Sequence, residues 1–156
     1  HDVMLRVLAD GPFESFMSEH ERAVYHQDNP LVTDETREDA DRLRQADALL
    51  FCYPTVLFTV PAVLKSWLER VLVPGVAFVF DDKERVRPGM TNIRRIGAIT
   101  TSAHSTRTTR RARDAGRRTI LWNIRLNCHP LARRTFVSVP TGTNEVAKIR
   151  RALRRW

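Results

Sequence analysis

The clearest pattern of apolar and polar positions runs from residue 46 to residue 80. A short apolar run at residues 48–53 lies between Asp47 and Pro54, which is the length and the flanking typical of a buried strand. After a loop, Pro61 stands before a segment in which apolar residues recur at helical spacing, and proline is well tolerated in the first turn of a helix. The pattern therefore predicts a strand, a loop, and a helix over residues 61–73.

The predicted helix has one apolar and one polar face. The face expected in the core carries Leu64, Trp67, Leu68, Val71 and Leu72. The face expected in water carries Lys65, Ser66, Glu69 and Arg70. Pro74 and Gly75 are expected to end the helix. The loop before it leaves the carboxyl end of a strand, where open parallel sheets bind their ligands.

Further strands are predicted at residues 3–8, 95–101 and 134–139, and an exposed covering helix at residues 33–45. Asp114 is expected to cap a helix that buries one side of residues 115–128. That side is made of Ile120, Leu121, Ile124 and Cys128. Thr143 is expected to cap a terminal helix that buries Val146, Ile149, Leu153 and Trp156. Residues 10–32 and 81–90 are predicted to be loops and turns.

Length and composition fit a single globular domain over residues 1–156, with 42% hydrophobic and 28% charged residues. No apolar run approaches the length of a membrane span, and no leader precedes the first predicted strand. The two cysteines, Cys52 and Cys128, form no metal-like cluster, and His20 and His26 have no partner pattern for a metal site. We expect a cytoplasmic protein without a metal.

The chain is strongly basic, with a net charge of +8 that rests on 23 arginines, since three of the 26 basic residues are lysines. The arginines are spread over several predicted helices, which favours solvated helix faces over a nucleic-acid surface. The positive potential would still attract anionic ligands such as nicotinamide dinucleotides.

The segment from Tyr53 to Phe78 resembles the flavodoxin-like NAD(P)H:quinone oxidoreductases. The resemblance is carried by Tyr53-Pro54-Thr55, by residues 61–71 (PAVLKSWLERV), and by residues 74–78 (PGVAF). It implies an α/β fold, a flavodoxin-like parallel sheet with helices on both faces. Two tryptophans of the family pattern are replaced here by Val56 and Leu57, and a glycine after the second strand's threonines is also replaced.

The resemblance also implies a function. A hydride would pass from NAD(P)H through FMN or FAD to a quinone or similar small acceptor, in a homodimer with active sites at its two-fold interface. The cofactor would lie between two walls formed by Pro54, Thr55, Val56, Leu57 and Phe58 and by Thr100, Thr101, Ser102 and Ala103. His104 is the titratable group expected near developing charge, as the catalytic candidate.

The family's first strand and phosphate-binding loop would lie upstream of His1, so the sequence is interpreted as N-terminally truncated. Residues 3–8 would then have no native neighbour, and either a displaced strand or a closed gap is expected. Without a phosphate anchor, the chain is expected to bind flavin weakly. The basic segment at residues 105–113 would either order on a dinucleotide phosphate or form a mobile loop.

Two other functions remain open on the sequence. A non-catalytic ancillary subunit of a potassium-efflux system, with a membrane-protein partner, would agree with the replaced tryptophans and the absent phosphate loop. Nucleic-acid binding rests on the charge alone.

Overall fold

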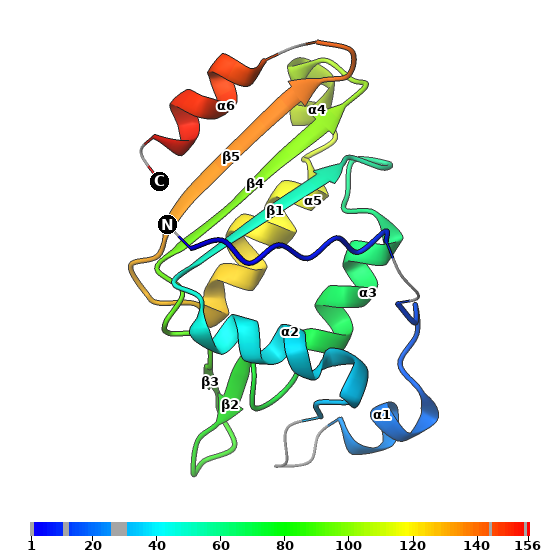
Figure 1. The fold of residues 1–156 in the computed structure, drawn as a ribbon, viewed down its shortest axis with the longest axis vertical. Coiled ribbons are helices and arrows are strands. Elements are labelled where there is room, and N and C mark those ends of the chain that lie inside the picture. Colours follow the sequence, from blue (N-terminus) through cyan, green and yellow to red (C-terminus); the bar gives the residue numbers. More distant parts are fainter. Residues whose placement is uncertain (1, 11–12, 26–30, 144, 155) are drawn as a thin grey trace.

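A parallel sheet forms the centre of the fold in the computed structural model, which describes residues 2–10, 13–25, 31–143, 145–154 and 156 (Figure 1). Its strands are β1 (Ala48–Pro54), β4 (Arg95–Ser102) and β5 (Arg133–Pro140), in the order β1-β4-β5. Tyr53 pairs with Thr100, and Thr100 pairs with Ser138, so the strands end at one edge of the sheet. The predicted parallel pairing of the strands at residues 48–53 and 95–101 is confirmed.

The middle strand β4 is packed on both faces. Ile96 and Ala98 are fully buried, as is usual for a central parallel strand. Gly97 lies so close to its neighbours that a Cβ atom there would be 2.8 Å from the backbone oxygen of Thr135 and 3.2 Å from the ring of Trp156. The backbone of β4 is therefore held tightly between β5 and the C-terminal tryptophan.

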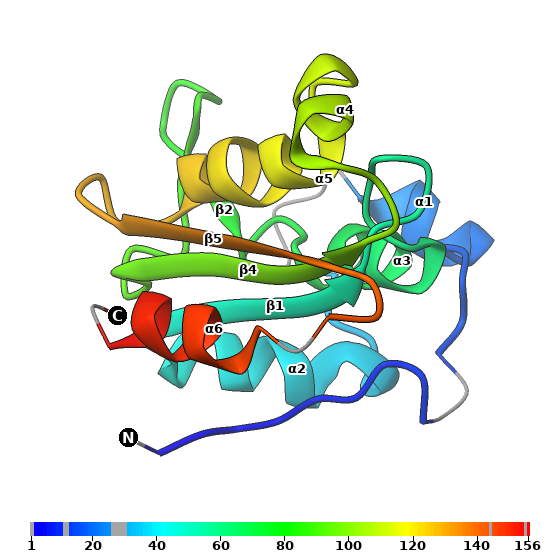
Figure 2. The ribbon, with the colours of Figure 1, turned by 90° about the horizontal axis from the view of Figure 1, so that it is seen from above.

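Helices cover both faces of this sheet, as predicted (Figure 2). One side carries α2 (Asp34–Gln45) and α6 (Val146–Leu153). The other carries α5 (Ala115–Arg118), which continues through a π-helical turn, η1 (Thr119–Asn123), into a 3-10 turn, η2 (Ile124–Asn127). The Asp114 side chain caps α5 by accepting a hydrogen bond from Arg117 N at 2.9 Å, and the predicted apolar side of this segment is buried.

Helix α3 (Ala62–Val71) follows Pro61 and buries Leu64, Trp67 and Leu68, as the apolar stripe predicts. Lys65 and Glu69 are exposed and form an ion pair on the outer face. The prediction that Ser66 and Arg70 are also exposed is wrong, because both are buried.

The reason is a cluster of charges contributed by distant segments. Arg70 lies 3.1 Å from Glu21 Oε1 and 2.6 Å from Glu35 Oε2, and it donates to Glu14 O at 3.0 Å. Glu21 belongs to α1 (Glu19–Val24), a short helix with a capping box formed by Ser18 and Glu21. The predicted loop over residues 10–32 therefore contains a helix that anchors Arg70. His20 is exposed, and His26 lies outside the described residues.

The strand predicted at residues 3–8 does not form. The segment is extended but pairs with no strand, and Val3 and Leu5 are exposed. It is held to α2 by Arg6, 3.4 Å from Asp39, and by Arg42, which donates to Leu5 O at 3.5 Å. Alternation alone cannot make a strand without a hydrogen-bonding neighbour, so the segment lies outside the sheet and is not the displaced strand that was one of the two expectations.

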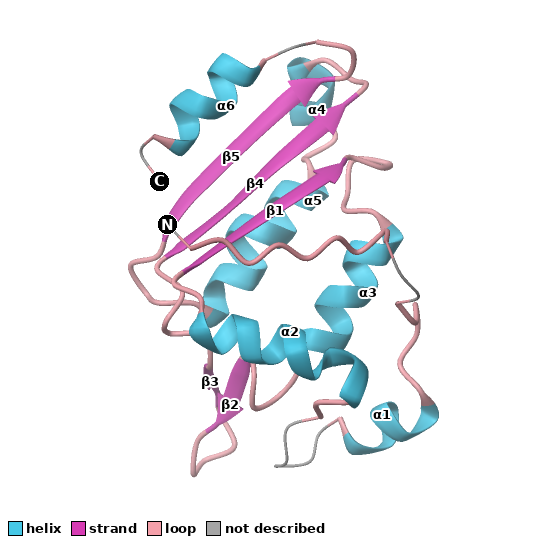
Figure 3. Ribbon diagram, viewed as in Figure 1, coloured by secondary structure: helices cyan, strands magenta, loops and turns pink. Residues whose placement is uncertain are grey.

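Two smaller features also differ from the predictions (Figure 3). The predicted loop and turn at residues 81–90 form part of a hairpin of β2 (Phe78–Phe80) and β3 (Val86–Pro88), with Asp81 accepting from Arg85 and Arg87. Glu145, rather than Thr143, occupies the N-cap of α6, because the Thr143 hydroxyl donates to Pro140 O at 2.8 Å. Of the four apolar residues expected to be buried by this helix, Val146 is exposed and the other three are half-buried.

Candidate functional site

The candidate site lies where β1 and β4 end side by side. Pro54 is in register with Thr101, and the backbone N–H of Thr55 donates to Thr101 O at 2.8 Å. The hydroxyls of Thr55 and Thr100 are 2.5 Å apart and share a hydrogen bond. The predicted convergence of the two loops is therefore confirmed, and it places both groups of predicted site residues at one edge of the sheet.

The loop after β1 makes an unusually tight turn. Val56 and Thr59 exchange two backbone hydrogen bonds, of 3.1 and 2.9 Å. Between them Leu57 and Phe58 have φ angles of 46° and 61°, the left-handed region that favours glycine or asparagine in such turns. Leu57 is 89% exposed, and Val56 is also exposed. The turn presents apolar side chains to solvent at the cost of backbone strain.

The segment after β4 alternates between buried and exposed positions. Thr100 and Ser102 are buried, and Thr101, Ala103 and His104 are exposed. The Ser102 hydroxyl accepts from His104 N at 3.2 Å, and its carbonyl accepts from Thr141 N at 2.9 Å. The Thr100 hydroxyl already shares a hydrogen bond with the Thr55 hydroxyl. Among the described residues at the end of β4, the exposed Thr101 therefore carries the threonine hydroxyl that a ligand can reach.

The two predicted walls touch each other. The rings of Phe58 and His104 stack with centroids 4.7 Å apart and an interplanar angle of 23°. The Phe58 carbonyl also accepts from Gly116 N at 3.2 Å, which joins the turn to α5. The predicted site residues thus form one continuous surface rather than two separated walls.

Tyr53 is a site component that the sequence prediction missed. Its hydroxyl is buried and has no hydrogen-bond partner within the described part of the chain. The Tyr53 hydroxyl oxygen lies 3.1 Å from the position that a Cβ atom on Gly116 would occupy. Burial, helped by the charge of Asp114, raises the pKa of Tyr53, which keeps its hydroxyl protonated as a donor at neutral pH. An unpaired buried hydroxyl at the base of the loops is a group that a ligand or water can satisfy.

A basic surface flanks these loops. Residues 106–111, expected either to order on a phosphate or to form a loop, are helix α4 (Thr106–Arg111), started by the Ser105 hydroxyl, which accepts from Thr108 N at 3.2 Å. Arg107, Arg111 and Arg113 are exposed. Within the predicted segment at residues 105–113 the structure therefore has a helix where a loop was one of the two alternatives, and a role in phosphate binding stays a prediction.

A cavity of about 630 Å³ lies elsewhere, at the amino end of β5, and none of the predicted site residues lines it. Among the residues that the structure describes, no group of histidine, cysteine, aspartate or glutamate side chains has the arrangement of a metal site. Within the same residues, no helix has the length and apolar content needed to cross a membrane.

Comparison with known proteins decides the family. A model of the flavodoxin-like fold family matches residues 1–131, which is most of the chain. The chain belongs to the flavodoxin-like fold family. The structure is also similar to that of an NAD(P)H:quinone oxidoreductase from Methanothermobacter marburgensis, with a TM-score of 0.69 and 22% identity over 91% of this chain and 74% of that one.

Curated relatives match shorter segments of this flavodoxin-like chain. Ribosyldihydronicotinamide dehydrogenase [quinone] from Homo sapiens is 42% identical over 53 residues, or 34% of this chain and 22% of that protein. NAD(P)H dehydrogenase [quinone] 1 from Rattus norvegicus is 37% identical over 67 residues, or 43% of this chain and 24% of that protein. The matched segments therefore span about a quarter or less of these relatives' length.

Proposed function

We propose that this chain is a flavin-dependent oxidoreductase that transfers a hydride from NAD(P)H, through FMN or FAD, to a quinone or a similar acceptor. The observation that carries the proposal is the contact of Phe58 with His104, which joins two loops at the sheet edge where parallel α/β folds bind ligands. The dehydrogenase and oxidoreductase names of the relatives support it over an ancillary subunit of a potassium-efflux system.

The residues at this edge fit the ring of a flavin. Val56 and Leu57 supply exposed apolar contacts, and Thr101 supplies an exposed hydroxyl. The Tyr53 hydroxyl lies buried beneath the loops without a partner among the described residues. A bound flavin supplies the redox chemistry, and the protein binds and orients it. His104 would hold or release a proton at the edge of the bound ring, where its imidazole is exposed and fixed by Phe58.

We propose FMN as the first of the two flavins to test. A structurally similar protein, general stress protein 14 from Treponema denticola, was solved in complex with FMN, with a TM-score of 0.50 and 22% identity over 85% of this chain and 73% of that one. The exposed arginines Arg107, Arg111 and Arg113 would attract the anionic parts of a flavin or of NAD(P)H.

The proposal extends to assembly and location. Exposed Val56 and Leu57 support a homodimer that covers this edge of the sheet. A cytoplasmic location agrees with the supply of NAD(P)H that the reaction needs. Sedimentation at increasing protein concentration tests the dimer, and a monomer at high micromolar concentration would contradict it.

A flavin titration followed by a turnover assay tests the function. Quenching of FMN or FAD fluorescence should show saturable binding, and flavin-loaded protein should oxidise NADH or NADPH faster when a quinone is added. Replacing His104 with alanine should lower turnover by about 10²-fold if it moves a proton, whereas His20→Ala, at another exposed histidine, should not. Thr101→Val should weaken binding, and Thr91→Val, at an exposed threonine outside the site, should not.

Absence of saturable binding of both flavins, or equal turnover with and without added quinone, would contradict the proposed function. If the site variants and their two controls had equal effects, the flavin site would not lie at this edge of the sheet.

A further inference from the structure

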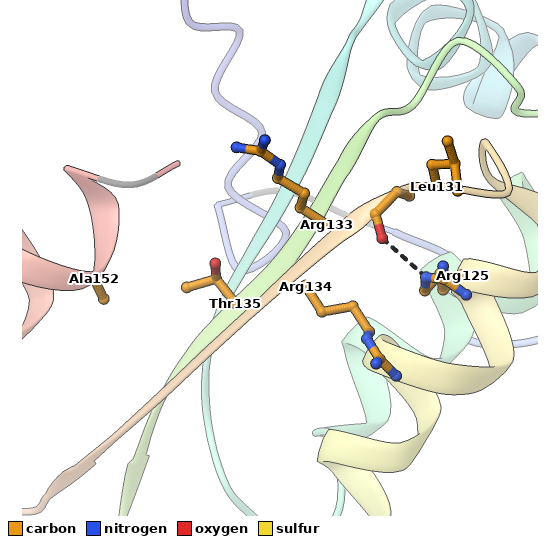
Figure 4. A pocket seen from close by; sticks show the side chains of 7 residues that line it. Arg125, Leu131, Arg133, Arg134, Thr135 and Ala152 are labelled. Carbon is orange, nitrogen blue, oxygen red and sulfur yellow. Dashed lines mark hydrogen bonds between the residues drawn. The ribbon is translucent and has the colours of Figure 1, made fainter.

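The amino end of β5 carries a basic surface that the proposed reaction does not use. The cavity of about 630 Å³ at this end is lined by Arg125, Arg133 and Arg134 (Figure 4). None of the ion pairs found among the described residues involves these three arginines. Their charge is therefore not neutralised by a carboxylate at hydrogen-bond distance.

Two of these arginines are fixed in place by uncharged partners. Arg125 donates to Ala132 O at 3.0 Å and to Pro130 O at 2.7 Å, which ties η2 to the loop before β5. The guanidinium of Arg134 lies over the ring of Trp122 at 4.3 Å. Both guanidinium groups are thus held in place in the absence of an anion. Little side-chain freedom therefore remains to be lost when an anion binds to them.

The same end exposes large apolar side chains. Leu131 is 81% exposed, Leu126 is 72% exposed and Trp122 is 58% exposed. Figure 2 shows the loop between η2 and β5 projecting beyond the start of β5, and Figure 1 shows it on the flank of the molecule. Leu131 belongs to that loop and lines the cavity with the arginines. Exposed apolar residues gathered beside a charged cavity mark an interaction surface.

The sequence around this surface has a single charge sign. Residues 115–144 contain no aspartate or glutamate and include five arginines. A second copy docked on this surface by a two-fold axis would bring arginines against arginines, which opposes self-association. A small anion would satisfy the arginines and leave the leucines in water.

Apolar side chains beside arginines that project to both sides of β5, accompanied by a tryptophan, match the chemistry of an anionic lipid surface. Acyl chains accept the leucines, the interfacial region favours tryptophan, and headgroup phosphates accept guanidinium groups. We propose that this end of the molecule binds an anionic membrane surface, with Leu131 entering the interface and Arg125, Arg133 and Arg134 contacting headgroup phosphates. The binding is peripheral, since it uses a loop and one end of the sheet.

Vesicle sedimentation tests the proposal directly. Vesicles of phosphatidylcholine mixed with phosphatidylglycerol should bind the protein, and vesicles of phosphatidylcholine alone should not. Binding should weaken as salt rises towards about 0.15 M, because exposed charges are then screened beyond about 8 Å. Double replacement of Arg133 and Arg134 with glutamine should lower partitioning about 30-fold.

Leu131→Asn separates lipid insertion from simple charge attraction, because it removes the apolar side chain without changing the charge. It should lower vesicle binding, whereas Val3→Asn, at a position that is 82% exposed in the N-terminal segment, should not. Lipids with brominated acyl chains should quench the tryptophan fluorescence of the unmodified protein. The quenched part should be the emission of Trp122, so the variant Trp122→Phe should show less quenching. This second readout does not depend on the folding of a surface variant at position 131.

No binding to the anionic vesicles would overturn the proposal. Equal binding by the unmodified protein and by Leu131→Asn would instead identify a general polyanion surface and would overturn the proposal. Binding of a duplex RNA that competes with the vesicles and is insensitive to Leu131→Asn would do the same.

Discussion

Phe58 and His104 stack face to face across two loops that are 46 residues apart in sequence, with ring centroids 4.7 Å from each other. The contact fixes the turn after β1 against the segment after β4, at the sheet edge proposed to bind flavin. Neither residue is in a strand. The geometry of the surface therefore depends on this contact as well as on the hydrogen bonds between β1 and β4.

A double-mutant cycle measures the contact. Single replacements of Phe58 and His104 by alanine, and the double replacement, should show a coupling in the free energy of unfolding of about 0.5–1.5 kcal/mol, the range of paired aromatic rings. The cycle is read from denaturant melts. Additive effects within error would mean that the rings do not stabilise each other in solution.

The strained turn gives a second prediction. Leu57 has a φ of 46° and its side chain is 89% exposed, so replacement with glycine removes strain and little packing. The added freedom of the unfolded chain offsets part of the gain, and we expect stabilisation of about 0.5–1 kcal/mol. Val56→Gly is the matched control, since Val56 is exposed without a positive φ, and it should destabilise. If both glycines destabilise equally, the turn is not strained.

Burial on α3 gives the third prediction. Leu68 is buried beside the core tryptophan Trp67, so Leu68→Ala should cost about 2–5 kcal/mol in denaturant melts. Lys65→Ala on the exposed face of the same helix should change stability by less than about 0.5 kcal/mol. A loss well under 1 kcal/mol for Leu68→Ala would show that the helix does not bury this face.

The buried charge cluster gives a prediction about acid. Burial alone would raise the pKa of Glu21, but hydrogen bonds from Ser18 and Arg70 outweigh it and hold that pKa below its ordinary value of 4.5. The pKa of Glu35 is likewise lowered, since hydrogen bonds from Arg70 and from Glu14 N outweigh burial. Because both folded-state values are depressed, the stabilisation is complete above the unfolded value and is lost as pH falls through the folded values.

The free energy of unfolding should therefore decrease as pH falls below about 4.5, and this decrease should be smaller when both glutamates are replaced by glutamine. Glu38→Gln together with Glu69→Gln is the control, since both residues are exposed on helix surfaces. If the free energy of unfolding decreases equally at low pH when Glu21 and Glu35 are both replaced, the decrease comes from other carboxylates.

The sequence predicted the parts of the fold that depend on local pattern. The buried runs that became β1 and β4, the stripe on α3 and the Asp114 cap all follow from spacing that neighbouring residues determine. Their adjacency followed from the rule that parallel strands end at one edge, which brought Pro54 and Thr101 together.

The failures share a physical cause, which is dependence on distant partners. Arg70 is buried because Glu21 and Glu35 approach it from other helices, and helical spacing carries no information on that. The alternation at residues 3–8 has no adjacent strand to pair with. Likewise, the orphaned hydroxyl of Tyr53 and the stacking of Phe58 on His104 arise only when α5 and two loops pack together.

Hydrogen–deuterium exchange with and without FMN tests the central claim most directly, because it reports where the flavin binds without altering the protein. FMN should slow exchange at residues 54–58 and 100–104, and the amino end of β5 at residues 130–135 should be unchanged. Protection confined to residues 125–135, or no protection at saturating FMN, would contradict a flavin site at the carboxyl ends of β1 and β4.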